Sequence, residues 1–215
     1  MPSLQSVCSS NWPSPEDSST EPVLLLLHGY GSHEHDLAGL APMLPPGIPW
    51  ASPRAPIDMG YGAAAWFPLV DLEGDPAPEP VADATAALWE WIGATVPAGA
   101  PLIPVGFSQG GFMALQLLRT RPMRVAGAVV LAGFTTSAVQ AADLDVAADR
   151  PEVLWCRGDA DPVVAGALVR RTAQWFEEHA TVHEHVYPGL THGINEQLMA
   201  DVRTYIDGVV EGLQH

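Results

Sequence analysis

The sequence has few of the residues that build a cross-linked or membrane-spanning protein. It contains only two cysteines, Cys8 and Cys156, and no Cys-x-x-Cys pair, which excludes a disulfide framework and favours a reduced, cytoplasmic compartment. The longest apolar run, Val125–Phe134, is too short to cross a bilayer. Residues 1–22 are rich in serine and proline and lack the basic start and apolar stretch of a signal peptide, so we expect a loose N-terminal tail.

Positive charge is also scarce. There is no lysine, and nine arginines stand against 25 acidic residues, which gives a formal net charge of −16. A surface of this sign repels phosphate backbones and anionic lipids, so we expect neither a nucleic-acid partner nor stable membrane association. The phosphate-binding Gly-x-x-x-x-Gly-Lys motif is absent, and no dinucleotide-binding glycine pattern follows the first predicted strand. A nucleotide cofactor is therefore not expected.

Short apolar runs alternate with segments of helical periodicity along most of the chain. The length of 215 residues and the 47% of apolar residues suit one domain with a sizeable core, over residues 23–215. The apolar runs predict strands at Val23–Leu27, Ile48–Ser52, Leu102–Phe107, Val125–Leu131, Val153–Arg157 and Val182–Tyr187. Helices are expected over about 81–95, 108–120, 162–179 and 194–209, with one short helix in 135–150 and an irregular loop over 53–80. Such alternation predicts an α/β fold with a mostly parallel sheet covered on both faces.

The segment Gly-Phe-Ser-Gln-Gly-Gly at residues 106–111 contains the Gly-x-Ser-x-Gly nucleophile elbow, between an apolar strand and a helix. A sharp strand-to-helix turn exposes the serine hydroxyl, and glycines fit where the backbone passes close to its neighbours. The free N–H groups at the start of the following helix can stabilise an oxyanion. Ser108 is therefore the candidate nucleophile; the alternative is a serine that only caps the helix.

A nucleophilic serine needs a histidine base and an orienting carboxylate, in the chain order Ser, Asp, His for this fold class. Asp159 and Asp161 both follow the strand Val153–Arg157, at the sheet edge where sites form. We favour Asp161, with Asp159 in a turn or capping role. His192 lies in the loop after the next strand and is the expected base. Structural or solvent-facing roles are expected for the nearby histidines His179, His183 and His185.

The oxyanion hole needs two N–H donors. The N–H of Gln109, which follows the nucleophile, is the first, and that of Tyr30, in the glycine-containing loop after the first strand, is the second candidate. The alternative is that this loop merely makes a tight exit from the strand.

A metal site was considered at His33 and His35, which flank Glu34. This cluster lacks the helical i, i+4 histidine pair with a following ligand, and a solvated polar loop explains it better. We therefore expect no metal.

Four segments carry a resemblance to a known family: Leu27–Gly31, Gly106–Gly111, Gly158–Val164 and Gly189–Gly193. From about Val23 to the C-terminus the chain resembles the phospholipase/carboxylesterase family, which includes bacterial carboxylesterases and acyl-protein thioesterases. The resemblance implies a single-domain, minimal α/β-hydrolase without a lid domain. It also implies that Trp66 and Phe67 lie near the acyl-binding site, although burial in the core would explain this pair nearly as well.

Two departures from the family pattern bear on the substrate. Ala132 stands where the family often has serine, and the acidic, proline-rich stretch Asp71–Pro80 has no counterpart that we can place. The absence of a lid domain predicts an open cleft that turns over soluble short esters.

Together these features predict a serine carboxylesterase that hydrolyses short-to-medium acyl esters through a Ser-His-Asp triad and an acyl-enzyme, without a cofactor. The expected partner is a small-molecule acyl ester, and a homodimer is left open. An acyl thioesterase or lysophospholipase with the same machinery is the first alternative. A non-catalytic binding protein that retains the fold is the second, and it would be expected to lack a member of the triad.

Overall fold

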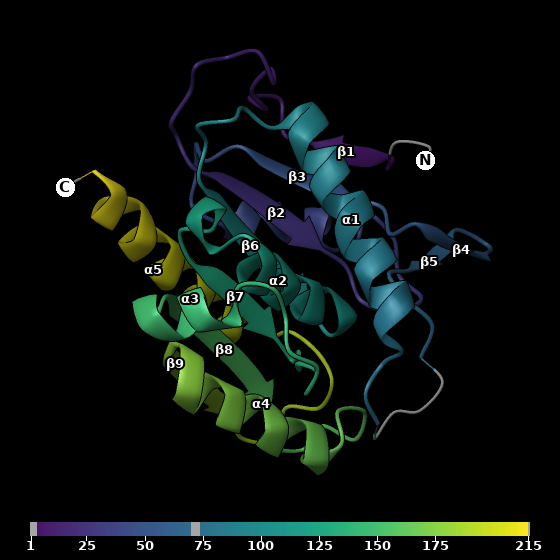
Figure 1. Ribbon diagram of the computed structural model, residues 1–215. Coiled ribbons are helices and arrows are strands. Elements are labelled where there is room, and N and C mark those ends of the chain that lie inside the picture. The colour runs from purple at the N-terminus through teal and green to yellow at the C-terminus, as the bar shows by residue number, and fades with distance from the viewer. Residues whose placement is uncertain (1–3, 70–73, 215) are drawn as a thin grey trace.

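A seven-stranded sheet forms the centre of the computed structural model, which describes residues 4–69 and 74–214 (Figure 1). The strand order is β1-β3-β2-β6-β7-β8-β9, and every neighbouring pair is parallel except β1 with β3. The strands are β1 Ser6–Cys8, β2 Val23–Leu27, β3 Trp50–Pro53, β6 Leu102–Phe107, β7 Ala128–Leu131, β8 Glu152–Gly158 and β9 Thr181–Tyr187. A separate two-stranded hairpin is formed by β4 Ile57–Gly60 and β5 Ala63–Ala65.

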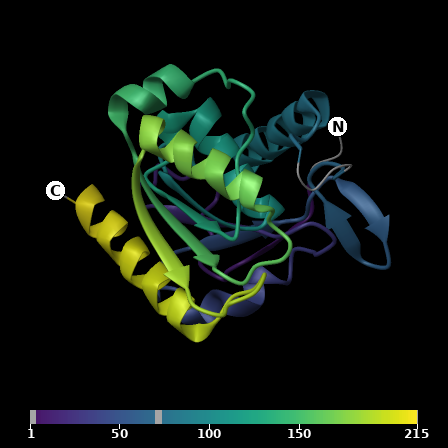
Figure 2. The same cartoon turned by 90° about the horizontal axis from the view of Figure 1, so that it is seen from below.

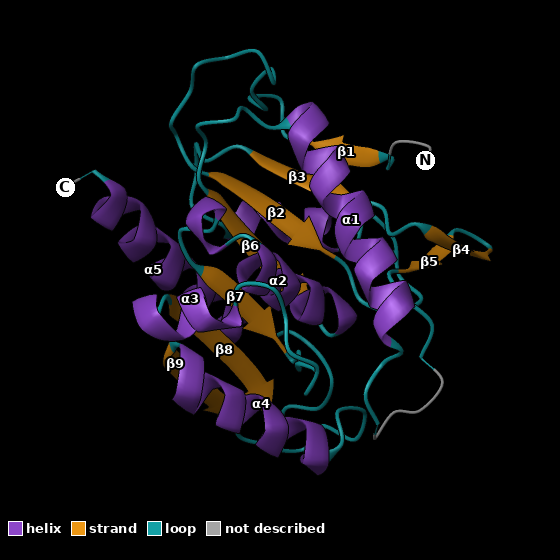
Figure 3. Ribbon diagram, viewed as in Figure 1, coloured by secondary structure: helices purple, strands orange, loops and turns teal. Residues whose placement is uncertain are grey.

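Helices cover both faces of the sheet (Figures 2 and 3). One face carries α1 Pro78–Thr95, α2 Gln109–Thr120, α3 Asp143–Asp149 and α4 Gly166–His179. The other face carries α5 Glu196–Leu213 and the 3₁₀ helix η1 Leu37–Met43; a further 3₁₀ turn, η2, spans Pro122–Arg124. The predicted α/β fold with a mostly parallel, doubly covered sheet is thereby confirmed. Within the described residues, no helix is long and apolar enough to cross a membrane.

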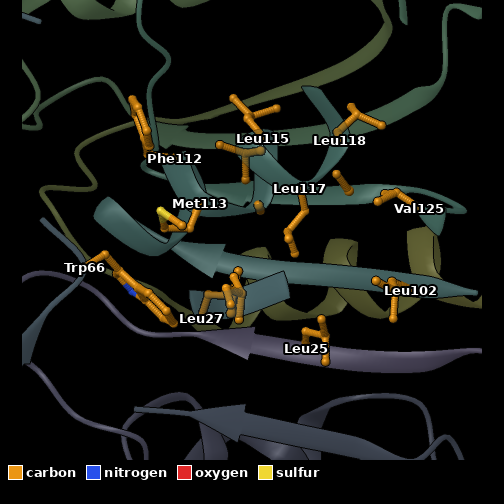
Figure 4. Packing of buried hydrophobic residues seen from close by; sticks show 14 of the residues in the cluster. Leu25, Leu27, Trp66, Leu102, Phe112, Met113, Leu115, Leu117, Leu118 and Val125 are labelled. Carbon is orange, nitrogen blue, oxygen red and sulfur yellow. The ribbon is translucent and has the colours of Figure 1, made fainter. Parts of the chain in front are cut away.

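The central strands are apolar along their whole length because both faces of the sheet are covered. Every residue of Val23–Leu27 is buried, as is every residue of β7. Leu25 and Leu27 face the α2 side and Leu24 and Leu26 face the α5 side, so one strand supplies both halves of the core. Figure 4 shows the α2 half, where residues of α2 pack over β2 and β6.

The N-terminal segment differs from its prediction. Residues 1–22 were expected to form a loose tail, but β1 adds an antiparallel edge strand to the sheet. In addition, the ring of Trp12 stacks on that of Trp91 in α1, with 6.4 Å between centroids. A three-residue strand is too short to show an alternating pattern, which is why composition alone suggested a tail.

The region 53–80 also differs from the predicted irregular loop. It contains the hairpin β4–β5, and α1 begins at Pro78 rather than near residue 81. Proline suits the first turn of a helix because the N–H that it lacks has no partner there. Of the acidic stretch Asp71–Pro80, residues 71–73 lie outside the described residues.

The strand order positions the site. β2 and β6 are neighbours, paired from Val23–Leu102 to Leu27–Gly106, but the chain leaves β2 toward β3 on one side and later continues from β6 to β7 on the other. This is a topological switch point, at which the loops after the two strands diverge and leave a crevice. The loop after β2 and Ser108 after β6 both lie at this point.

Candidate active site

Ser108 occupies a strained turn between β6 and α2. Its φ and ψ angles are 55° and −116°, in a region that non-glycine residues rarely adopt. The backbone is held on both sides: the N–H of Ser108 donates to the carbonyl of Leu131 at 2.7 Å, and its carbonyl accepts from the N–H of Phe112 at 3.1 Å. The hydroxyl makes no capping hydrogen bond to the helix. The alternative of a serine that only caps α2 is therefore wrong, and the hydroxyl is left available for chemistry.

Two glycines make this turn sterically possible. A Cβ atom at Gly106 would overlap the backbone of Gly110, and one at Gly110 would overlap the carbonyl of Leu27. The elbow thus packs directly on the end of β2. The motif glycines are required by close backbone approach, as the sequence predicted.

His192 and Asp161 meet at the same edge of the sheet. Nδ1 of His192 lies 2.8 Å from Oδ2 of Asp161, whose side chain is 7% exposed. The other carboxylate oxygen, Oδ1, accepts from the backbone N–H groups of Val163 and Val164 at 2.8 and 3.1 Å. The imidazole also packs on Phe107, the residue before Ser108, at 4.9 Å between ring centroids. The structure therefore brings the predicted base and acid together beside the elbow.

Asp159 has a different role from Asp161. Its Oδ1 accepts the N–H of Gly189 at 2.6 Å and so fixes the turn that leads to His192. The adjacent Gly158 has no room for a Cβ atom because the carbonyl of Leu190 would overlap it. Asp159 is thus a turn residue, in the capping type of role that the sequence suggested.

The loop after β2 lies against the elbow. The N–H of Tyr30 finds no acceptor within residues 4–69 and 74–214, and that of Gln109, in the first turn of α2, has no acceptor within its helix. Both predicted oxyanion donors are thus unpaired within the described part of the chain. Tyr30 itself is 42% exposed, so its environment is open to a ligand.

His28 holds this loop from inside, a role that sequence reasoning missed. It is fully buried; its Nε2 accepts the N–H of Ala55 at 3.0 Å, and Nδ1 lies 2.8 Å from the carbonyl of Gly29. Since Nε2 is an acceptor, Nδ1 carries the proton and donates to Gly29. Burial lowers the pKa of His28 below its ordinary value, so this imidazole is neutral at pH 7 and structural.

Trp66 and Phe67, which the resemblance places near the acyl-binding site, are buried in the core. Trp66 is one of the core side chains labelled in Figure 4, and both residues are tied to the elbow through the side chain of Gln109. Its Oε1 accepts the N–H of Trp66 at 2.9 Å, and its Nε2 donates to the carbonyl of Phe67 at 2.7 Å. This burial fits the core alternative for the pair, and a place near the acyl site stays a prediction. The amide of Gln109 is a second positioning group that sequence reasoning missed, although it lies inside the motif.

The cavity beside Ser108 is small and mostly apolar. Its volume is about 30 Å³, far below the several hundred Å³ of a pocket for a drug-sized ligand. The described residues that line it are Leu69, Gly74, Pro76, Ser108, Phe134, Val163, Val164 and Leu168. Gly74 and Pro76, from the described end of the acidic, proline-rich stretch, thus border this cavity.

Two other potentially reactive groups are the His33 and His35 pair and the thiol of Cys156. The rings of His33 and His35 lie 5.8 Å apart, but within residues 4–69 and 74–214 no group of three or more possible ligands could hold a metal ion. Cys156 is buried beside Tyr187, and burial raises the pKa of its thiol to about 12. This thiol is therefore protonated at neutral pH and inert.

Comparison with known proteins agrees with this architecture. The family model described as Phospholipase/Carboxylesterase matches residues 14–210. Acyl-protein thioesterase 1 of Cryptococcus neoformans is 25% identical over 225 residues, which cover 90% of this chain and 94% of that protein. Acyl-protein thioesterase 1 of Debaryomyces hansenii is 28% identical over 109 residues, so this match spans 49% of the chain and about half, 47%, of that relative. The Bacillus cereus carboxylesterase structure has a TM-score of 0.78 at 23% identity, covering 96% of this chain and 94% of that one.

A mostly parallel sheet with a serine elbow at a strand-to-helix turn defines a hydrolase of the α/β-hydrolase superfamily. Because the family model matches most of its length, the chain belongs to the phospholipase/carboxylesterase family. The resemblance drawn from the four motif segments is thereby confirmed.

Proposed function

We propose that this hydrolase is a serine carboxylesterase that cleaves short-to-medium acyl esters through Ser108, His192 and Asp161. The observation that carries the proposal is the 2.8 Å contact between His192 and Asp161 at the sheet edge where Ser108 leaves its strand. A carboxylate on Nδ1 of an imidazole leaves Nε2 free to take a proton from a serine hydroxyl. The chain order Ser, Asp, His is the order of this fold class.

Acylation begins when Oγ of Ser108 attacks the acyl carbon and its proton passes to Nε2 of His192. Asp161 accepts the Nδ1 hydrogen, keeps the ring in the working tautomer and stabilises the imidazolium. The N–H groups of Tyr30 and Gln109 donate to the oxyanion of the tetrahedral intermediate. His192 then returns the proton to the leaving alkoxide, which departs as the alcohol.

Deacylation repeats these steps with water. His192 takes a proton from the water, whose oxygen attacks the acyl carbon of the Ser108 ester, and the serine leaves with that proton restored. In each half His192 takes one proton from the attacking oxygen and gives it to the leaving oxygen, so the imidazole ends the cycle neutral. No metal or organic cofactor enters this scheme.

A second candidate uses the same residues on thioesters or lysophospholipids. The names of the relatives favour it, because those from Cryptococcus neoformans and Debaryomyces hansenii are acyl-protein thioesterases. The acyl-enzyme half of the reaction is shared, so the two candidates differ in the leaving group that the site accepts.

The test is a panel of p-nitrophenyl esters of increasing acyl length, with an acyl-CoA and a lysophospholipid of matched acyl chains. We expect the highest kcat/KM on a short ester. The Ser108→Ala variant should lose activity on every substrate in the panel, which excludes a contaminating hydrolase. A higher kcat/KM on the acyl-CoA or the lysophospholipid than on any ester would contradict the carboxylesterase proposal and favour the second candidate.

A further inference from the structure

A short strap borders the cavity beside Ser108. We define the strap as residues 74–77, the part of the acidic, proline-rich stretch that precedes α1 (Figure 1). Gly74 and Pro76 supply one wall of the cavity. The other lining residues include the apolar side chains of Phe134, Val164 and Leu168. An apolar lining next to the candidate nucleophile suits the hydrocarbon part of an acyl group.

Asp75, between the two wall residues, fastens the strap to two other parts of the chain. Its Oδ1 lies 2.6 Å from Nη1 of Arg171 on α4 and accepts the N–H of Ser137 at 3.1 Å. The hydroxyl of Ser137 donates to Oδ2. These partners are 96 and 62 residues away in the sequence, so the contacts are purely tertiary. We call this set of three residues the latch.

The segment that carries Ser137 is itself held by hydrogen bonds. Arg119, 1% exposed, donates through Nη1 to the hydroxyl of Thr135 and the carbonyl of Thr136, which directly precede Ser137. Its Nε and Nη2 hold Asp143 at 2.8 and 2.7 Å. The N–H of Thr135 also donates to the hydroxyl of Thr172 on α4 at 3.0 Å, next to Arg171. The strap is thus fixed to a segment that buried hydrogen bonds anchor to α2 and α4.

The latch is charged at neutral pH. Partial burial alone would raise the pKa of Asp75, but the hydrogen bonds from Ser137 and the nearby Arg171 charge outweigh it and hold this pKa below its ordinary value. The side chains of Arg171 and Asp75 are 26% and 32% exposed, so salt weakens the pair only in part.

We propose that the latch sets the acyl-chain length of this enzyme by holding the strap across the acyl cavity. Asp75, Arg171 and Ser137 are then positioning residues, and the substrate class is esters of short acyl chains. A cavity of about 30 Å³ has room for one or two carbon atoms beyond the reacting carbonyl. A longer chain must displace Gly74 and Pro76, and the latch opposes that displacement. This inference rests on the proposed serine-esterase function.

The experiment measures kcat/KM for p-nitrophenyl acetate and p-nitrophenyl octanoate, both below their solubility limits. In Asp75→Ala the octanoate-to-acetate ratio of kcat/KM should rise at least about tenfold, because the strap can move aside, while acetate turnover stays within about threefold. Arg171→Ala, which removes the other partner of the ion pair, should raise the same ratio. The double variant should show no more than the larger single effect, since both substitutions break one contact.

The matched control is Asp83→Ala, which removes the same charge from an exposed position on α1. Its ratio should equal that of the unsubstituted protein. Raising the salt concentration should raise the ratio in the unsubstituted protein more than in Asp75→Ala, because only the former has an ion pair to screen.

The outcomes separate the two proposals. An unchanged octanoate-to-acetate ratio in Asp75→Ala and Arg171→Ala, with acetate still hydrolysed, overturns the latch and leaves the esterase intact. An equal loss on both esters also overturns it, because the latch would then support the fold and not the chain length. Absence of hydrolysis of every ester by the unsubstituted protein contradicts the proposed function itself.

Discussion

Asp159 and Asp161 stand two positions apart on one loop, yet they contact different groups. A carboxylate oxygen of Asp161 lies 2.8 Å from Nδ1 of His192, and the other accepts two backbone N–H groups. Asp159 instead accepts the N–H of Gly189. In the proposed mechanism the first contact orients the base, whereas the second contact fixes a turn. Two carboxylates on one loop therefore differ in role because they meet different partners.

Replacement of Asp161 by asparagine should lower kcat by about three to four orders of magnitude, because the amide favours the wrong tautomer of His192. Asp159→Asn should cost far less, since its amide oxygen can still accept the N–H of Gly189. Steady-state kinetics on a soluble ester, with circular dichroism to confirm the fold, compares the two. A larger loss in Asp159→Asn would show that the wrong carboxylate has been assigned.

At the scale of elements, the elbow depends on close contact between α2 and the end of β2. Gly110→Ala places a methyl group on the carbonyl of Leu27, so we expect a loss of at least about 2 kcal/mol in the free energy of unfolding. The control is Gly208→Ala, in the middle of α5, where a Cβ atom meets nothing within 4 Å. It should stabilise the protein by about 0.5–1 kcal/mol. Urea titration measures both, and a neutral Gly110→Ala would contradict the packing described for the elbow.

The elements that the sequence predicts well are those with a buried periodic pattern. The strand Leu102–Phe107 has the predicted bounds, and α5 follows the apolar positions from Leu198 to Val209. The sequence does not predict β1, β4 and β5, which have three or four residues each. Such strands form because neighbouring chain segments pair with them, and a local pattern carries no sign of that pairing.

The candidate site shows the same division. The placement of Ser108, Asp161 and His192 at one edge of the sheet could be predicted because each follows an apolar strand and the chain order is constrained. The latch could not be predicted, since Asp75 meets Ser137 and Arg171 only after the sheet has formed. His28 resembles an ordinary loop residue in the sequence. Its role depends on a hydrogen bond from the N–H of Ala55, which lies in the loop after β3.

At the scale of the whole molecule, protonation of His28 should lower the free energy of unfolding as the pH falls. Its pKa is lowered in the folded state by burial and stands near ~6.5 in the unfolded chain. Below that pH the unfolded state binds the extra proton, so the free energy of unfolding decreases as the pH falls toward the folded pKa. Carboxylates with lowered pKa values, such as Asp143 and Asp201, lose their contribution only near and below about pH 4.

The free energy of unfolding, measured by urea titration between pH 7 and pH 5, tests this assignment. His28→Gln should flatten the decrease, whatever its effect at pH 7. The exposed-site control His33→Gln should retain the decrease. An equally steep decrease in His28→Gln would assign the acid sensitivity to other groups.

The central claim is that Ser108 carries the acyl group between the two halves of the reaction. The most direct measurement is mass spectrometry of the protein quenched within its first turnovers of p-nitrophenyl acetate, followed by peptide mapping. The account predicts one added acetyl group on Ser108. In Asp161→Asn, where deacylation is slow, it predicts a burst of nitrophenol equal to the enzyme concentration. Ser108→Ala should give neither signal. An acetyl group on another residue that turns over at the rate of catalysis, or full hydrolysis by Ser108→Ala, would contradict it.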